Sequence, residues 1–140
     1  MIDTIVLARL IEGNPDASRA AERTLKASLR GPQFGLVCAQ VIQEFWVVAT
    51  RPVTANGLGL EPVAANECVS EFLRTFLFLP HPPELFSKWR ELVMRTETRG
   101  KTAHDTKLVA LMELVGVERV MTFNSRDFRR FPNVEVVVPP

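Results

Sequence analysis

The chain lacks long apolar runs, and this absence excludes one class of protein. No stretch approaches the roughly 18 to 20 consecutive apolar residues that a membrane-spanning helix needs. The opening residues, Met-Ile-Asp-Thr, also lack the basic segment and apolar core of a signal peptide. We therefore expect a cytoplasmic protein that does not associate with a membrane.

The sequence also contains few cysteines and has little net charge. The only two cysteines, Cys38 and Cys68, do not have the spacing of zinc ligands, and we expect both to be reduced thiols. The net charge is +1, far from the strong positive balance that is typical of nucleic-acid-binding proteins. A basic surface, if there is one, must therefore arise from charges sorted onto one face.

The 140 residues suit one domain, 1–140, with one core. Periodic apolar spacing predicts helices up to residue 10 and over residues 16–29, 39–49, 62–75, 84–95 and 103–114. Short apolar runs predict strands at the N-terminus, before the first helix, and at 34–38, 76–79, 120–123 and 134–138. Asn14-Pro15, Gly31-Pro32 and Thr50-Arg51-Pro52 interrupt the pattern. This alternation predicts a three-layer α/β/α domain with a central, mostly parallel sheet.

Several acidic side chains fall where such a fold binds its ligands, beyond the carboxyl ends of the strands. Asp3 follows the first strand residues, and Asn124 and Asp127 follow the strand at 120–123. Glu44 interrupts an apolar helical stripe, and Asp105 opens a helix. The inward stripes that contain these two acids comprise Val41 and Val48 in one helix and Leu108, Val109, Met112 and Val115 in the other.

Carboxylates that share a cleft need a compensating cation, because their like charges repel one another. Oxygen ligands without nearby Cys or His pairs favour Mg²⁺ or Mn²⁺ over zinc, and such an ion suits phosphodiester cleavage. Each acid also has an ordinary structural interpretation. Asp3 would be a terminal turn residue, Asp105 a helix N-terminal acid, Asp127 a cap, and Glu44 the partner of Arg51.

At these positions the sequence resembles the PIN-domain family, especially VapC-type toxins of bacterial toxin–antitoxin pairs. Residues 3–7, Asp-Thr-Ile-Val-Leu, are similar to the family's Asp-Thr-Asn-Val-Leu, with Ile5 in place of the asparagine. Residues 40–46 with 49–52 resemble the second acidic motif and 100–105 with 108–110 the third. Residues 121–128 resemble the fourth, and 134–139 the closing strand.

The resemblance implies a Mg²⁺-dependent endoribonuclease, with Mn²⁺ as a substitute, whose metal is bound by Asp3, Glu44 and Asp105. Asn124 or Asp127 would complete the site, and Thr122 matches a hydroxyl residue found beside it. The resemblance also implies an RNA substrate, a cognate antitoxin and a homodimer. The apolar faces around 72–78 and 85–93 are candidates for an interface or for core packing. Arg99, Lys101, Arg126, Arg129 and Arg130 are candidates for steering the RNA backbone.

Two alternatives remain open at this point. The first is a catalytically impaired PIN fold that binds RNA or a protein, which Ile5 and Asn124 favour. The second is another Mg²⁺ enzyme on an α/β sheet, such as a phosphatase or receiver-like domain. The second lacks support because no aspartate follows two residues after Asp3, and no Gly-rich phosphate loop or Ser/His/Asp arrangement is evident.

Overall fold

The structure, a computed structural model, describes residues 1–13, 15–28 and 34–140. The helices are α1 (Thr4–Ile11), α2 (Pro15–Ser28), α3 (Ala39–Thr50), α4 (Pro62–Thr75), α5 (Leu85–Arg95), α6 (Thr102–Val115) and α7 (Ser125–Phe128), with one 3₁₀ turn, η1 (Val53–Ala55). The strands are β1 (Leu36–Cys38), β2 (Leu77–Leu79), β3 (Arg119–Met121) and β4 (Glu135–Val137). The predicted breaks at Asn14 and Gly31-Pro32, and the predicted helix end at Leu29, lie outside the described residues.

The strands form two parallel pairs, β1 with β2 and β3 with β4. Extended residues 1–3 join the two pairs. Ile2 N–H donates to the Leu36 carbonyl at 2.8 Å, and Met121 N–H donates to the Met1 carbonyl at 2.8 Å. Ile2 also forms a parallel bridge with Met121. The N-terminal segment therefore lies at the centre of the sheet, between β1 and β3.

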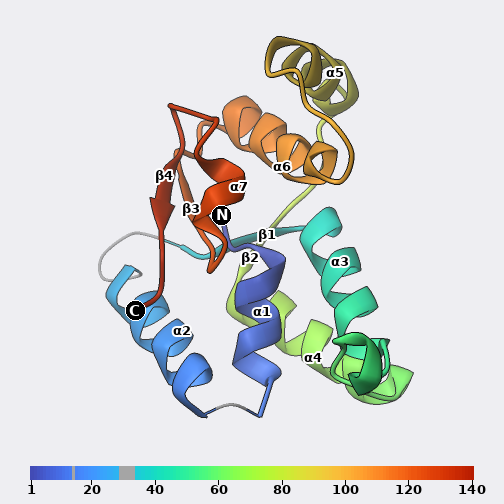
Figure 1. Ribbon diagram of the computed structural model, residues 1–140. Coiled ribbons are helices and arrows are strands. Elements are labelled where there is room, and N and C mark those ends of the chain that lie inside the picture. The colour runs from blue at the N-terminus through green and yellow to red at the C-terminus, as the bar shows by residue number, and fades with distance from the viewer. Residues whose placement is uncertain (14, 29–33) are drawn as a thin grey trace.

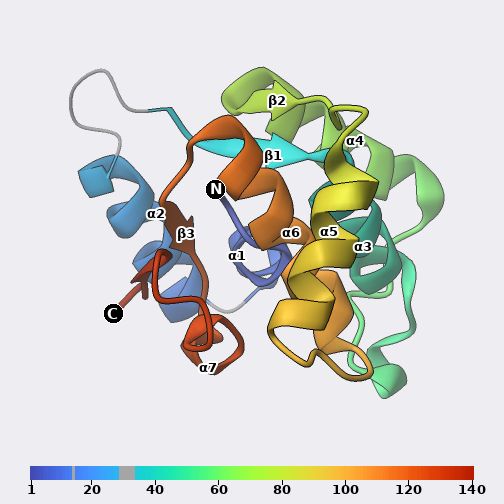
Figure 2. The same cartoon turned by 90° about the horizontal axis from the view of Figure 1, so that it is seen from above.

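Helices cover the sheet on both sides. Figure 1 shows α5 and α6 above the β1–β2 pair, with α1, α2 and α4 below it. Figure 2, seen from above, shows α5 and α6 nearest the viewer and α1 behind them. The predicted three-layer α/β/α architecture with parallel strands is confirmed.

The helices form where the apolar spacing predicts them, because each buries one stripe against the sheet. In α3 the buried side chains include Val41, Phe45 and Ala49. The core of the domain also contains Val6, Leu7, Val37, Leu92, Leu108, Val109, Met112, Val120 and Phe128, each at most 3% exposed. α6 ends at Gly116, whose φ of +70° is the left-handed conformation that glycine adopts most readily.

The structure corrects some local predictions. β2 is an edge strand, so Leu77 and Phe78 are 55% and 42% exposed rather than buried in a covered sheet. The fourth predicted strand ends at Met121, so Thr122 and Phe123 lie beyond it. In α6 the stripe closes at Met112, because Val115 is in the exposed last turn. The short helix α7 was not predicted as an element, because four residues carry no measurable period.

Both cysteines are free, as predicted: Cys38 is buried and Cys68 half-buried. Across residues 1–13, 15–28 and 34–140, none of the helices has the length and apolar character to cross a membrane.

Candidate active site

A cleft of about 610 Å³ opens beside the carboxyl ends of the central strands. Five of the six predicted site residues line it: Asp3, Glu44, Asp105, Asn124 and Asp127. The same cleft is also lined by Thr4, Ile5, Ala8, Val47, Val48, Arg51 and Lys101. The sixth predicted residue, Thr122, is fully buried and hydrogen-bonded to Asp3. The fold thus gathers acids from four separated segments at one place.

Asp3 is held at both carboxylate oxygens. The Thr122 hydroxyl donates to Oδ2 at 2.5 Å, and the backbone N–H of Thr4 donates to Oδ1 at 2.7 Å. Asp3 is therefore the N-cap of α1, and it also lines the cleft. Burial raises the pKa of Asp3, the two hydrogen bonds oppose the rise, and the charges of Glu44 and Asp127 add to it.

Glu44 is also held at both oxygens, by neighbours on two helices. The Thr4 hydroxyl donates to Oε2 at 2.9 Å, and the Gln40 side-chain amide donates to Oε1 at 2.9 Å. His104 Nδ1 lies 3.8 Å from the same Oε1, although the His104 side chain is 72% exposed. The predicted salt bridge to Arg51 is not among the ion pairs found across the described part of the chain. Glu44 is thus oriented by two neutral donors.

The pKa of Asp105 shows how the acids of the cleft affect one another. Its pKa is raised to about 6, first by burial and then by the negative charges of Asp127, Asp3 and Glu44, while His104 opposes the rise. The four carboxylates therefore act on one another through a partly desolvated cleft. Their repulsion disfavours the fully ionised state, and a cation placed among them would relieve it.

Asn124 and Asp127 lie together at the start of α7. The Asn124 side-chain amide donates to Asp127 Oδ2, and the Asn124 backbone N–H donates to the Thr122 hydroxyl at 3.0 Å. Thr122 therefore links Asp3 to this loop. Both Asn124 and Asp127 line the cleft, and each offers an oxygen to it.

Only one of the five predicted basic residues lines the cleft. Lys101 does so, together with Arg51, which was not predicted as a substrate-binding residue. Arg130 lines a different pocket beside Phe131 and Pro132. Arg99, Arg126 and Arg129 are exposed, and none is among the residues that line the cleft.

The oxygen-only donor set of the cleft suits a hard divalent cation rather than zinc. No group of three His, Cys, Asp or Glu side chains within the described ranges stands close enough to hold a metal ion as it is. A cation in this cleft is therefore inferred from the oxygen donors and from the negative charges of Asp127, Asp3 and Glu44, which act on Asp105.

Gln40 is another residue of the site that sequence reasoning missed. It is buried, and its amide also donates to the His104 carbonyl at 2.8 Å, which ties α3 to the first turn of α6. A signal was available in the sequence, because Gln40 precedes Glu44 by four residues and such pairs face each other on a helix.

A model of the PIN domain matches residues 1–134. The chain belongs to the PIN domain family. Among solved structures, a toxin–antitoxin complex from Klebsiella pneumoniae is similar with a TM-score of 0.67 at 21% identity, over 99% of this chain and 96% of that one. VapC20, a sarcin-ricin loop cleaving toxin of Mycobacterium tuberculosis, gives 0.64 at 21% identity, over 85% of both chains. No curated protein matches the chain.

At this level of identity the likeness to the two solved structures demonstrates the fold of this PIN domain and not its activity. The acids of the cleft occupy the positions that the sequence motifs predicted. Ile5 lines the cleft at the position where the motif has an asparagine, so an apolar side chain faces the acids there.

Proposed function

We propose that this PIN domain is a metal-dependent endoribonuclease that hydrolyses RNA phosphodiester bonds. The observation that carries the proposal is the gathering of Asp3, Glu44, Asp105 and Asp127 in one cleft, where burial and then the charges of the other three acids raise the pKa of Asp105. Like charges gathered at a partly desolvated cleft are costly to the fold. Their placement therefore points to a function that requires them.

Asp3, Glu44 and Asp105 would hold Mg²⁺ or Mn²⁺, with Asn124 or Asp127 completing the donor set. When bound, the ion would lower the pKa of a water and neutralise charge on the scissile phosphate. The four acids repel a phosphodiester anion, so a bound cation would favour substrate binding at this cleft.

The chain's own residues prepare this chemistry by fixing the acids before substrate arrives. Thr122 and the Thr4 N–H orient Asp3, while the Thr4 hydroxyl and Gln40 orient Glu44. None of the four donors carries a charge, so each fixes a geometry without cancelling the negative field. Such preorganisation removes reorganisation that would otherwise add to the barrier.

Lys101 and Arg51 would bind the RNA backbone on either side of the reacting phosphate. Both are exposed and line the cleft together with the acids. Cationic side chains at the cleft attract phosphates.

The toxin role is part of the same proposal and rests on the likeness to the toxin–antitoxin complex and to VapC20. A cognate antitoxin would silence the enzyme by placing a segment in the acidic cleft, where a basic side chain would find complementary charge. A homodimer is proposed as well. Only part of the predicted interface at 72–78 and 85–93 could contact a second copy. Leu73, Leu77 and Phe78 are exposed, whereas Phe72, Phe76, Leu85 and Leu92 are buried in the core.

The test is cleavage of total cellular RNA by the purified chain in Mg²⁺, in Mn²⁺ and in EDTA, beside Asp105→Asn and a matched Asp16→Asn control on α2. Discrete products are expected in either metal, with none in EDTA or from Asp105→Asn and unchanged products from Asp16→Asn. A folded chain that neither cleaves RNA nor binds Mn²⁺ would instead favour the RNA- or protein-binding module, for which Ile5 in the cleft is the supporting observation.

A further inference from the structure

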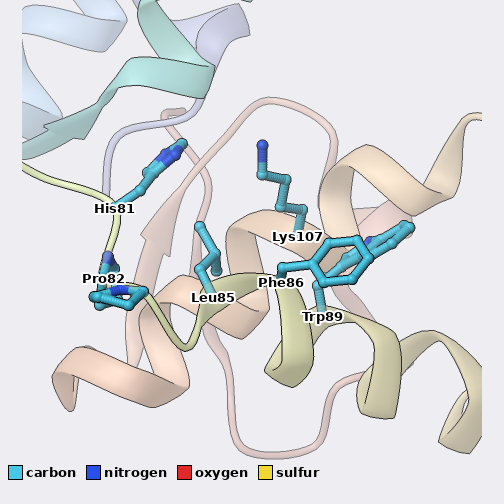
Figure 3. A pocket seen from close by; sticks show the side chains of 7 residues that line it. His81, Pro82, Leu85, Phe86, Trp89 and Lys107 are labelled. Carbon is cyan, nitrogen blue, oxygen red and sulfur yellow. The ribbon is translucent and has the colours of Figure 1, made fainter.

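Another pocket, of about 410 Å³, lies beyond the end of β2, between α5 and α6. Figure 3 shows Phe86 and Trp89 from α5 forming an aromatic wall, Pro82 and Leu85 the floor, and His81 and Lys107 extending over it. The two aromatic rings lie 5.8 Å apart at 38°. Phe86 is 66% exposed, although burial of its apolar ring would stabilise the fold.

We propose that this pocket is a nucleobase subsite of the RNA substrate, in which an unpaired base stacks on Phe86 and Trp89 while Lys107 binds its phosphate. The inference rests on the proposed ribonuclease function and names where the flanking nucleotide binds. Single-stranded RNA is recognised through bases stacked on aromatic side chains, with cations along the backbone.

The first turns of α6 connect this pocket to the catalytic cleft. Lys101 and Asp105 line the cleft, and Lys107, two residues further along the same helix, lines the pocket. The Trp89 indole N–H donates to the Ala103 carbonyl at 3.0 Å, while Gln40 donates to the carbonyl of the next residue, His104. The helical segment that carries Asp105 is thus anchored from both sites.

The charges of the pocket favour a polyanion over a peptide or a neutral ligand. Within the part of the chain that the structure describes, the lining contains no acid, whereas Lys107 and His81 both belong to it. Burial, and after it the charge of Lys107, lowers the pKa of His81, and both side chains line the same pocket (Figure 3). Lys107 is in none of the ion pairs found among the described residues.

The experiment measures binding of a short oligouridylate to Asp105→Asn protein, in which cleavage is blocked. Phe86→Ala in that background is expected to weaken binding about fivefold to tenfold, the loss of part of one stacked base. Lys107→Gln is expected to weaken binding and to flatten its dependence on salt. Met94→Ala is the matched control, because Met94 is an exposed apolar residue of the same helix outside the pocket.

A second readout needs no change to the pocket. The chain has two tryptophans, so Trp46→Phe leaves Trp89 as the sole emitter. Oligouridylate should quench its fluorescence, and an abasic ribose-phosphate chain of the same length should not. Quenching by both chains alike would overturn stacking at this pocket.

The remaining outcomes separate the two proposals. If the wild type cleaves RNA while Phe86→Ala and Lys107→Gln leave oligouridylate binding unchanged, the subsite is wrong and the ribonuclease stands. If RNA is neither cleaved by the wild type nor bound by Asp105→Asn, both proposals fail. If Phe86→Ala leaves RNA binding intact but weakens binding of a cognate protein partner, the pocket is a protein-docking surface and the subsite is overturned.

Discussion

Gln40 donates to Glu44 Oε1 at 2.9 Å from one helical turn away, and the same amide nitrogen donates to the His104 carbonyl at 2.8 Å. One buried side chain therefore fixes an acid on α3 and the helical turn of α6 that carries Asp105. The distance between two of the three proposed metal ligands depends on this amide.

Gln40→Ala is expected to lower RNA cleavage about tenfold and the free energy of unfolding by about 1–2 kcal/mol, because both hydrogen bonds are lost and their acceptors stay partly buried. Cleavage and Mn²⁺ affinity should be measured at a temperature well below the midpoint of thermal unfolding. Gln43→Ala, at an exposed position of the same helix, is the control. Equal cleavage by the two variants would show that the bridge does not position the site.

Much of the fold was predictable because burial imposes a period on the sequence. The predicted helices end within one or two residues of the observed ones wherever both ends are described, as for α4 at Pro62–Thr75. β2 shows the limit of this reasoning. Its run of Leu77-Phe78-Leu79 is as apolar as a central strand, yet exposure at a sheet edge depends on which strands pair, and local sequence does not encode that.

The site, like the fold, was only partly predictable. The gathering of its acids was predictable, because they lie at strand ends and on apolar stripes, and a parallel α/β fold binds its ligands beyond the carboxyl ends of its strands. The direction of exposed basic side chains was not, since Lys101 lines the cleft and Arg130 another pocket although both lie in turns next to a helix. Hydrogen bonds between distant segments, such as Thr122 to Asp3, depend on tertiary contacts that no local pattern contains.

Thr122→Val tests the support of Asp3. The hydroxyl stabilises the ionised carboxylate, so its removal should raise the pKa of Asp3 further and weaken Mn²⁺ binding about tenfold, the loss of roughly one charge-assisted hydrogen bond. Carboxyl-carbon NMR titration and calorimetry measure the two effects. Thr122→Ser keeps the hydroxyl and should restore both values towards the wild type. A Thr122→Ser protein as impaired as Thr122→Val would instead indicate that the lost methyl packing matters.

The pKa of Asp105 predicts a pH dependence with a definite sign. Its folded value of about 6 lies above the ordinary value of 3.8, so the metal-free folded protein binds this proton more tightly than the unfolded chain. The stability it contributes is full below pH 3.8 and is lost as the pH rises through about 6. Mg²⁺ binding requires the ionised form, so it should weaken as the pH falls through the same range.

NMR titration of Asp105 checks this directly. Asp127→Asn removes the largest repelling charge and should lower the pKa of Asp105, whereas Asp16→Asn on α2 should leave it in place. Saturating Mg²⁺ should lower the pKa further by competing with the proton. If Asp127→Asn leaves the pKa of Asp105 unchanged, the two acids do not interact, and the proposal of a shared site is weakened.

Lys101 and Arg130 provide a matched pair for locating the RNA, because both were predicted to contact it and only Lys101 lines the cleft. Lys101→Ala should weaken RNA binding by Asp105→Asn protein and reduce the slope of log K against log salt by about 0.7, as expected for one lost phosphate contact with a single strand. Arg130→Ala should change neither quantity. Because both variants remove one positive charge, any effect of net charge appears in both, and the difference between them reports the contact alone. A larger loss in Arg130→Ala would place the RNA across the pocket beside Phe131 instead, away from Asp105.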